Sequence, residues 1–261
     1  YGYATSKGGE GMLILISPAK RMRSHVDFLD AKGKPPFLKQ SKRLLEELKT
    51  KGLVEIQHLL HCNEGIAKEA MQQYQSMDIE YGKVPALLAF DGIQYTYMRP
   101  DLFSDEAFCY CEQHLYILSG FYGVLGSMDG VCPYRLELDN PFSASFCKNL
   151  YAYWKDDLYR YVAAKDSCLL DLTSKQYGKI IKRYQDDDVR IVTCRFYEKE
   201  PSGLKEKGVY VKMARGEMVR WLAESNITRV EDVKAFSQLG YSYSEQHSHH
   251  EEFVFIRNAK R

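Results

Sequence analysis

A run of five apolar residues at positions 12–16 ends at Ser17, and Pro18, Ala19 and Lys20 follow it. The run is too short to cross a membrane and lacks the alternation of a half-buried strand. It is typical of a central strand that is covered on both faces. Because ligands bind at the carboxyl ends of strands in open α/β sheets, we expect Ser17 and Lys20 to lie at a functional edge.

Helical and strand patterns are interspersed along the rest of the chain. Periodicity and capping residues predict helices within 38–75, from 105 onward, and at 150–162 and 214–225. Further strands are predicted at 86–90, 115–118, 167–172, 190–196, 208–213 and 253–256. We therefore expect an α/β (mixed α+β) fold, a single compact domain with a central mixed sheet surrounded by helices.

The first eleven residues are rich in glycine, have no periodicity and precede Met12. We expect residues 1–11 to be a leader outside the fold and residues 12–261 to form the single domain. The apolar run at 12–16 is too short for the apolar region of a secretory signal peptide and has no basic segment before it. We therefore expect a cytoplasmic location. Seven cysteines without a C-x-x-C pair indicate reduced thiols that mainly pack in the core, with redox sensing as the alternative.

Charge excludes one class of partner-binding protein. Lys and Arg total 36 against 35 Asp and Glu, a formal net charge of +1, so a strongly basic histone-like binder is excluded. The stretch 175–220 nevertheless holds an excess of cations. This local excess either steers nucleic acid to one face or forms an ordinary solvated surface.

The usual signatures of nucleotide-binding, protease and hydrolase sites are absent, but three segments attract attention. Gly120 and Gly123 permit close backbone approach or positive φ, so their segment is either a hairpin that contacts nucleic acid or a tight turn under the sheet. Arg135 and Glu137, two apart in an extended segment, share a face and either orient a substrate or pair with each other.

The third segment places two cations at a predicted junction. Lys212 would end a strand and Arg215 would open the next helix. A helix start beside cations is a ready phosphate site. In contrast, His247, His249 and His250 form a dense polar loop in which we expect no metal site. His58 and His61 are left as surface or packing residues.

Six motifs resemble, in order and spacing, those of the bacterial peroxide-stress protein YaaA family, across about residues 12–257. They are Leu13-Ile14-Leu15-Ile16-Ser17-Pro18-Ala19-Lys20, Ala89-Phe90-x-Gly92-x-x-Tyr95-Thr96, Leu118-Ser119-Gly120-x-Tyr122-Gly123-Val124-Leu125, Pro133-Tyr134-Arg135-Leu136-Glu137, Leu150-Tyr151-x-x-Trp154 and Lys212-x-Ala214-Arg215-Gly216.

The resemblance implies a cytoplasmic protein that helps cells survive hydrogen peroxide by limiting unincorporated iron. It also implies a family-specific fold with a basic cleft that binds DNA, and a helix-hairpin-helix-like element near residues 119–125. It implies no established reaction, and we expect no cofactor.

The leading hypothesis is a monomeric DNA-binding protein with low sequence specificity for duplex or partly unpaired DNA, and no membrane partner. Phosphates would be held by Lys20, Arg135, Lys212, Arg215, Gly120 and Gly123. Unpaired bases would stack on Tyr95, Tyr122 and Tyr134.

The alternative is an enzyme that acts on a nucleotide, a nucleobase or a damaged DNA base in a small pocket. Its candidate catalytic residues are Ser17, Lys20 and Glu137, with Glu137 as the acid or base and Lys20 with Arg135 as anion holders. A third hypothesis, with the least support, is iron binding by His247, His249 and His250. Loops at one edge of a sheet converge, so we expect six of these residues to line one cleft: Ser17, Lys20, Arg135, Glu137, Lys212 and Arg215.

Overall fold

The computed structural model describes residues 11–258, so the expected leader, apart from Gly11, lies outside the described residues. Its centre is an eight-stranded mixed sheet with the order β11-β12-β9-β8-β1-β5-β6, in which β10 also pairs with β9. The bounds are β1 Leu13–Ile16, β5 Leu115–Ser119, β6 Gly123–Gly126, β8 Cys168–Leu172, β9 Arg190–Glu200, β10 Gly203–Lys205, β11 Ser242–Tyr243 and β12 Glu252–Asn258. Two small ladders pair β2 (Arg21–Met22) with β4 (Phe90–Asp91), and β3 (Val84–Pro85) with β7 (Gly130–Val131).

The middle of the main sheet is parallel. Strand β1 pairs in parallel with β5 and β8, and Ile14 lies opposite both Leu115 and Leu170. Strands β8, β9 and β12 continue the parallel run, while β6, β10 and β11 pair antiparallel with their neighbours. All four residues of β1 are buried, so the prediction of a central strand covered on both faces is confirmed.

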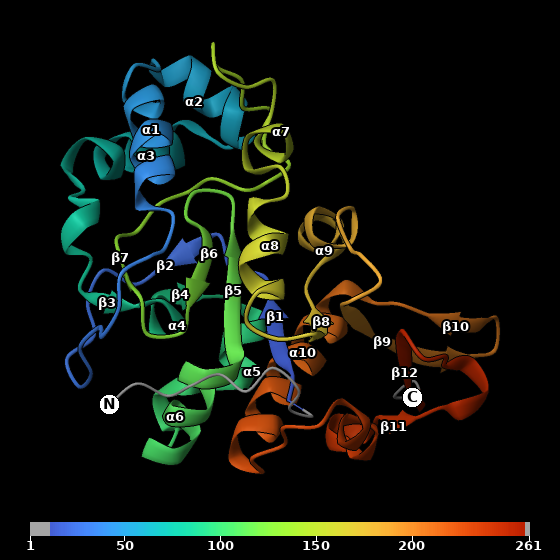
Figure 1. The fold of residues 1–261 in the computed structure, drawn as a ribbon. Helices are drawn as coiled ribbons and strands as arrows, with labels where there is room; N and C mark the ends of the chain where they lie inside the picture. The colour runs from blue at the N-terminus through green and yellow to red at the C-terminus, as the bar shows by residue number, and fades with distance from the viewer. Residues whose placement is uncertain (1–10, 259–261) are drawn as a thin grey trace.

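Helices surround this sheet and gather in groups (Figure 1). Helices α1 (Leu38–Lys49), α2 (Leu53–Leu60) and α3 (Glu64–Ser76) pack together at one end of the molecule. Helices α5 (Ile93–Met98), α6 (Asp105–His114) and α10 (Gly208–Glu224) pack together at the other end. The remaining α-helices are α4 Ala86–Ala89, α7 Leu150–Trp154, α8 Asp157–Ala163 and α9 Lys175–Lys182. The predicted mixed α/β class and single compact unit are confirmed.

Two predicted strands are helical instead. Residues 86–89 form α4, and only Phe90 and Asp91 continue as a strand. This segment is fully buried, so it shows neither helical nor strand periodicity, and Ala and Leu have high helix propensity.

The second misassigned strand, 208–213, is the beginning of α10. The alternation of Val209, Val211 and Met213 fits a strand, but packing against α5 decides the outcome. A Cβ on Gly216 would lie only 2.0 Å from the carbonyl oxygen of Gln94, so the two helices are in backbone contact there. The apolar face that begins at Val211 then runs along the whole helix.

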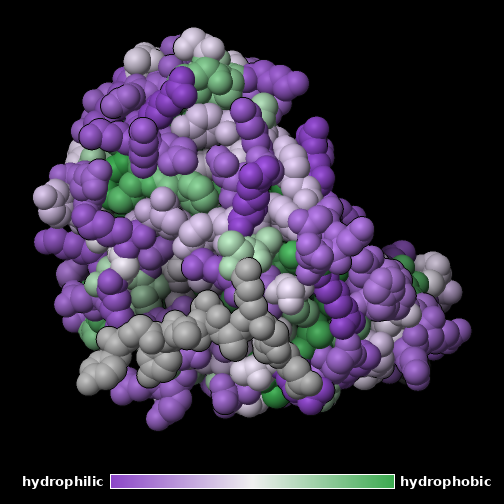
Figure 2. All heavy atoms as spheres, in the orientation of Figure 1, coloured by the Kyte–Doolittle hydropathy of each residue, from purple (hydrophilic) through white to green (hydrophobic). Residues whose placement is uncertain are grey.

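The predicted helix at 150–162 is interrupted. Lys155, at φ 46°, ends α7, and α8 begins at Asp157. The described part of the chain contains no helix long and apolar enough to cross a membrane. Figure 2 shows one face of the molecule, which is mainly hydrophilic with hydrophobic side chains in scattered groups.

Candidate functional site

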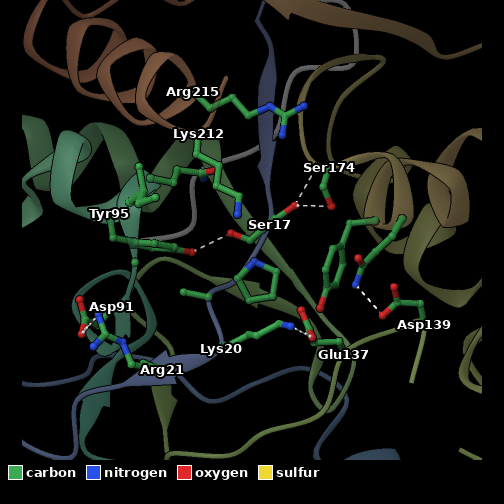
Figure 3. Close-up of a pocket in the computed structure, with 17 residues that line it drawn as sticks. Ser17, Lys20, Arg21, Asp91, Tyr95, Glu137, Asp139, Ser174, Lys212 and Arg215 are labelled. Atoms are coloured by element: carbon green, nitrogen blue, oxygen red, sulfur yellow. Dashed lines mark hydrogen bonds and ion pairs between the residues drawn. The ribbon is translucent and has the colours of Figure 1, made fainter. Parts of the chain in front are cut away.

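A pocket of about 510 Å³ opens at the carboxyl ends of β1 and β8 (Figure 3). The loop after β1 supplies Ser17 and Lys20, and the turn after β8 supplies Ser174. The opposite wall comes from α5 and α10, and the loop around Glu137 closes one side. The parallel pairing of β1 and β8 explains why segments so distant in sequence meet here.

Ser17 and Ser174 form the junction between the two strand ends. The backbone N–H of Ser174 donates to Ser17 Oγ at 2.8 Å, and Ser17 Oγ lies 3.4 Å from Ser174 Oγ. Ser174 is also the residue that precedes α9, so the amino-terminal end of that helix faces the same junction. The carbonyl of Ser17 accepts a 3.0 Å hydrogen bond from the Tyr95 hydroxyl, which fixes the loop from the other side.

Lys20 and Glu137 face each other across the pocket, with Nζ 3.0 Å from Oε2 (Figure 3). The backbone N–H of Glu137 donates to Asn140 Oδ1 at 2.7 Å, which fixes this loop. The Glu137 carboxylate therefore pairs with Lys20, and not with Arg135, among the described residues. A second pair, Arg21 with Asp91 at 3.2 Å, lies at the rim.

Lys212 and Arg215 both project from α10, and neither lies at a strand end or a helix start as expected. Three residues apart, they share one helical face. Lys212 is exposed, whereas Arg215 is only 7% exposed and its Nε has no hydrogen-bond partner among the described residues. Burial lowers the pKa of the Arg215 guanidinium, although the carboxylates of Asp171 and Glu206 act in the opposite direction.

The structure brings together most of the residues that were expected to line one cleft. Ser17, Lys20, Glu137, Lys212 and Arg215 all line the pocket. The sixth residue, Arg135, lines an adjoining hollow whose wall also includes Lys20, Arg21 and Asp91. The two spaces are therefore neighbours, and the roles of these residues toward DNA or in catalysis stay predictions.

The three tyrosines expected to stack on bases are instead core residues. Tyr122 is fully buried, and Tyr95 and Tyr134 are at most 5% exposed. Tyr134 shares a 2.6 Å hydrogen bond with Ser119, and Tyr122 accepts one of 3.1 Å from the N–H of Cys132. Their rings pack against other aromatic rings, although Tyr95 also lines the pocket and Tyr134 the adjoining hollow. Stacking on bases therefore stays a prediction, and this burial does not favour it.

The segment with Gly120 and Gly123 is a β-hairpin that joins β5 to β6, so it does not lie between two helices. A Cβ on Gly120 would lie 2.5 Å from the carbonyl oxygen of Leu136, and Gly123 has φ +76°. Both glycines are buried. The segment is therefore a tight turn within the main sheet, and its contact with nucleic acid stays a prediction.

Sequence reasoning missed a buried carboxylate beneath the pocket. Asp171, in β8, accepts hydrogen bonds from the backbone N–H of Thr173 at 2.9 Å and from the Thr193 hydroxyl at 3.4 Å. Its Oδ2 also lies 3.2 Å from Lys182 Nζ. A charged residue inside an otherwise apolar strand was the available signal. Gln94, Asp139 and Ser174 are further pocket residues that were not predicted.

The histidines of the C-terminal segment lie outside this pocket. His247 Nδ1 shares a 2.7 Å hydrogen bond with Ser244, and His249 Nδ1 accepts one of 3.3 Å from the N–H of Glu251. Within residues 11–258, no group of three or more His, Cys, Asp or Glu side chains is placed to hold a metal ion. The seven cysteines are free, and Cys109 and Cys111 differ in environment, exposed and buried respectively.

Comparison with known proteins gives a consistent result. The family model described as Peroxide stress protein YaaA matches residues 12–247. A UPF0246 protein of Desulfitobacterium hafniense is 47% identical over 246 residues, which cover 94% of this chain and 98% of that protein. UPF0246 proteins of Lachnoclostridium phytofermentans and Agathobacter rectalis are 42% and 40% identical, over 94% of this chain and 96% and 99% of theirs.

Proposed function

Because this chain belongs to the peroxide stress protein YaaA family, we propose that it acts in the cytoplasm as a monomer that binds DNA and limits unincorporated iron. The family assignment supports the role in peroxide stress. DNA binding and iron limitation are the finer parts of the proposal, and each has its own test below.

The observation that carries DNA binding is a row of exposed cations along α9. Gln176 lines the pocket, and Lys179 and Arg183 follow it at helical spacing on the same face. Lys179 and Arg183 border a second hollow together with Lys148 and Lys155. The described residues that line this hollow include no carboxylate. These four cations are all exposed.

This row complements the pocket, where the charge of two cations is already balanced. Lys20 pairs with Glu137, and Arg21 pairs with Asp91. Most of the attraction for phosphates would therefore come from Lys212 at the pocket and from the α9 cations. Tyr151 also lines this second hollow, with the Lys179 Nζ 5.4 Å from its ring centroid. A surface of this kind holds a phosphate backbone without reading its sequence.

Fluorescence anisotropy with a duplex and with a partly unpaired duplex tests DNA binding. If about three phosphates are neutralised, raising salt from 50 to 200 mM should weaken binding by roughly tenfold or more. A Lys179→Gln, Arg183→Gln double variant should bind more weakly and with a shallower salt dependence. Lys68→Gln removes an exposed cation that is paired with Glu64 on a distant helix and serves as the control. Binding that is absent at low salt, or insensitive to salt, would refute the proposal.

Iron limitation is supported by the family resemblance alone. Cells that lack the gene should contain more chelatable iron after hydrogen peroxide treatment, which whole-cell electron paramagnetic resonance measures. Unchanged iron in those cells would exclude this part of the proposal.

A second candidate function, an enzyme acting on a nucleotide, nucleobase or damaged base, is favoured by the form of the pocket. Its volume of about 510 Å³ suits a small molecule, and its wall holds a carboxylate and an ammonium group 3.0 Å apart. Such a pair can transfer a proton and hold an anion. Chromatography after incubation with nucleotides and with damaged DNA would detect turnover. Glu137→Gln should abolish it, whereas Glu69→Gln, in the adjoining hollow, should not.

A further inference from the structure

We infer that the inner end of the pocket is a binding site for a phosphate monoester, with Arg215 as its central residue. The inference deepens the proposed function, since it names a ligand class for the same pocket and rests on that pocket being functional. Arg215 is the group that requires explanation. Its side chain is buried, and its Nε has no hydrogen-bond partner among the described residues.

The two carboxylates that attract Arg215 electrostatically, Asp171 and Glu206, already have other partners. Asp171 pairs with Lys182 at 3.2 Å, and Glu206 pairs with Lys175 at 3.6 Å. Burying a cation without a bound partner costs free energy, because the cation loses its interactions with water and gains no hydrogen bonds or opposite charge in exchange. An anionic ligand in the pocket would supply that replacement.

Other donors converge on the same end of the pocket. Lys212 and Arg215 extend from α10 toward the Ser17–Ser174 junction, as Figure 3 shows. The amino-terminal end of α9 lies at this junction, and the positive end of a helix dipole favours an anion. Gln94, in α5 of the same wall, has a buried side-chain nitrogen without an acceptor among the described residues. These groups are donors or cations, so this end of the pocket suits an oxyanion.

Charge favours a phosphate monoester over a monoanion. A monoester carries about −1.5 to −2 charges near neutral pH, which matches the two cations Lys212 and Arg215. The carboxylates that line the pocket each have a partner, Asp91 with Arg21, Glu137 with Lys20 and Asp139 with Gln176. A free nucleoside monophosphate and a 5′-phosphorylated DNA end both present this chemistry.

The experiment compares ligands that differ only in the phosphate. Thermal unfolding and calorimetry would be run with inorganic phosphate, with deoxyadenosine 5′-monophosphate and with deoxyadenosine. We expect the first two to raise the melting temperature and the nucleoside to have no effect. Oligonucleotides with and without a 5′ phosphate separate the two sources of the monoester. If neither a free monoester nor a phosphorylated end binds more tightly than its unphosphorylated counterpart, the inference is overturned.

Variants then locate the site. Arg215→Gln should weaken phosphate binding at least tenfold while leaving the unliganded protein as stable as before or more stable. Lys212→Gln should also weaken phosphate binding. Because Lys212 is exposed, this variant tests the same site even if Arg215→Gln does not fold. Arg220→Gln, on the same helix but paired with Glu224, is the matched control and should bind phosphate normally. Unchanged phosphate binding in Arg215→Gln would refute the assignment, as would a large loss of stability without ligand.

The outcome is independent of the test for DNA binding. If duplex DNA fails to bind but phosphate monoesters bind through Arg215, the DNA proposal falls and this inference stands. If duplex DNA binds through α9 and no monoester binds, the reverse holds.

Discussion

The indole Nε1 of Trp154 donates a 3.0 Å hydrogen bond to the carbonyl oxygen of Gly120, so the last residue of α7 is tied to the turn between β5 and β6. Trp154, together with Leu158 of α8, also encloses the turn at Gly123. A Cβ on Gly123 would lie 2.9 Å from both the Trp154 ring and the Leu158 side chain. The family motif at this turn thus has a structural reason that does not involve a ligand.

Gly123→Ala should destabilise the protein by about 2–4 kcal/mol, because it combines backbone strain with overpacking. Urea denaturation would measure the loss. Gly240→Ala is the matched control, since Gly240 has nearly the same φ of +77° with nothing within 4 Å of the added carbon. Gly240→Ala should cost only the left-handed backbone strain, roughly 1–2 kcal/mol. Equal losses in the two variants would show that the enclosure by Trp154 is unimportant.

Asp129 should make stability depend on pH near neutrality. Burial raises the pKa of this carboxyl to about 6, although the Gly126 N–H donates to it and Lys165 attracts it. The ordinary value is about 3.9, so the folded state favours the protonated form. Burying the ionised carboxylate therefore lowers the free energy of unfolding. This loss is complete above pH 6 and disappears as the pH falls through 6 toward 4.

Asp129→Asn should therefore stabilise the protein at pH 8 by about 1–3 kcal/mol and lose this advantage by pH 4. Denaturation curves of both proteins between pH 4 and 8 would show the difference. Asp101→Asn, which removes an exposed carboxylate, should give no comparable trend. A constant difference between wild type and Asp129→Asn would exclude the explanation by burial.

Glu137→Gln separates the two candidate functions of the pocket. Removing this carboxylate frees Lys20, so DNA affinity at low salt should rise by up to about fivefold, the value of an exposed ion pair. Enzymatic turnover would instead be lost. Anisotropy and the turnover assay, run on the same preparation, make the comparison. A fall in DNA affinity would indicate that the Lys20–Glu137 pair positions the DNA-binding loop.

Gly216→Ala should disturb the wall of the pocket. The added carbon would lie 2.0 Å from the Gln94 carbonyl oxygen, so α5 and α10 must separate. We expect a loss of about 3 kcal/mol or more and weaker binding of phosphate. Gly208→Ala, at the start of the same helix with nothing within 4 Å, should leave both unchanged. Normal phosphate binding in a folded Gly216→Ala protein would show that the helix contact does not set the site.

Local patterns predicted the elements whose burial is evident from the sequence itself. The apolar run at 12–16 predicted a central strand, which the structure contains, and Lys20, which follows the run, lies in the pocket at the carboxyl end of that strand. The segment at 208–213 failed because its alternation is also compatible with the first turns of a helix. Which structure forms is decided by contact with Gln94, more than a hundred residues away in the chain.

The site was predicted in part for the same reason. Glu137 and Arg215 were identified, yet the pairing of Glu137 with Lys20 was not, because residue spacing favours a local partner. Asp171 was missed because its partners Lys182 and Thr193 come from separate elements. The burial of Tyr122 was missed because a tyrosine in a glycine-rich turn is usually half exposed.

The two walls of the pocket differ in how readily they can move. At Gly216, α10 is in backbone contact with α5. The two helices that form the wall with Lys212 and Arg215 are therefore held rigidly against each other. The facing wall consists of loops around Lys20 and Glu137, which are joined to each other by a partly exposed ion pair. Ligands of different size would therefore be accommodated by displacement of the loop wall. The position of an anion against the rigid wall would be common to all of them.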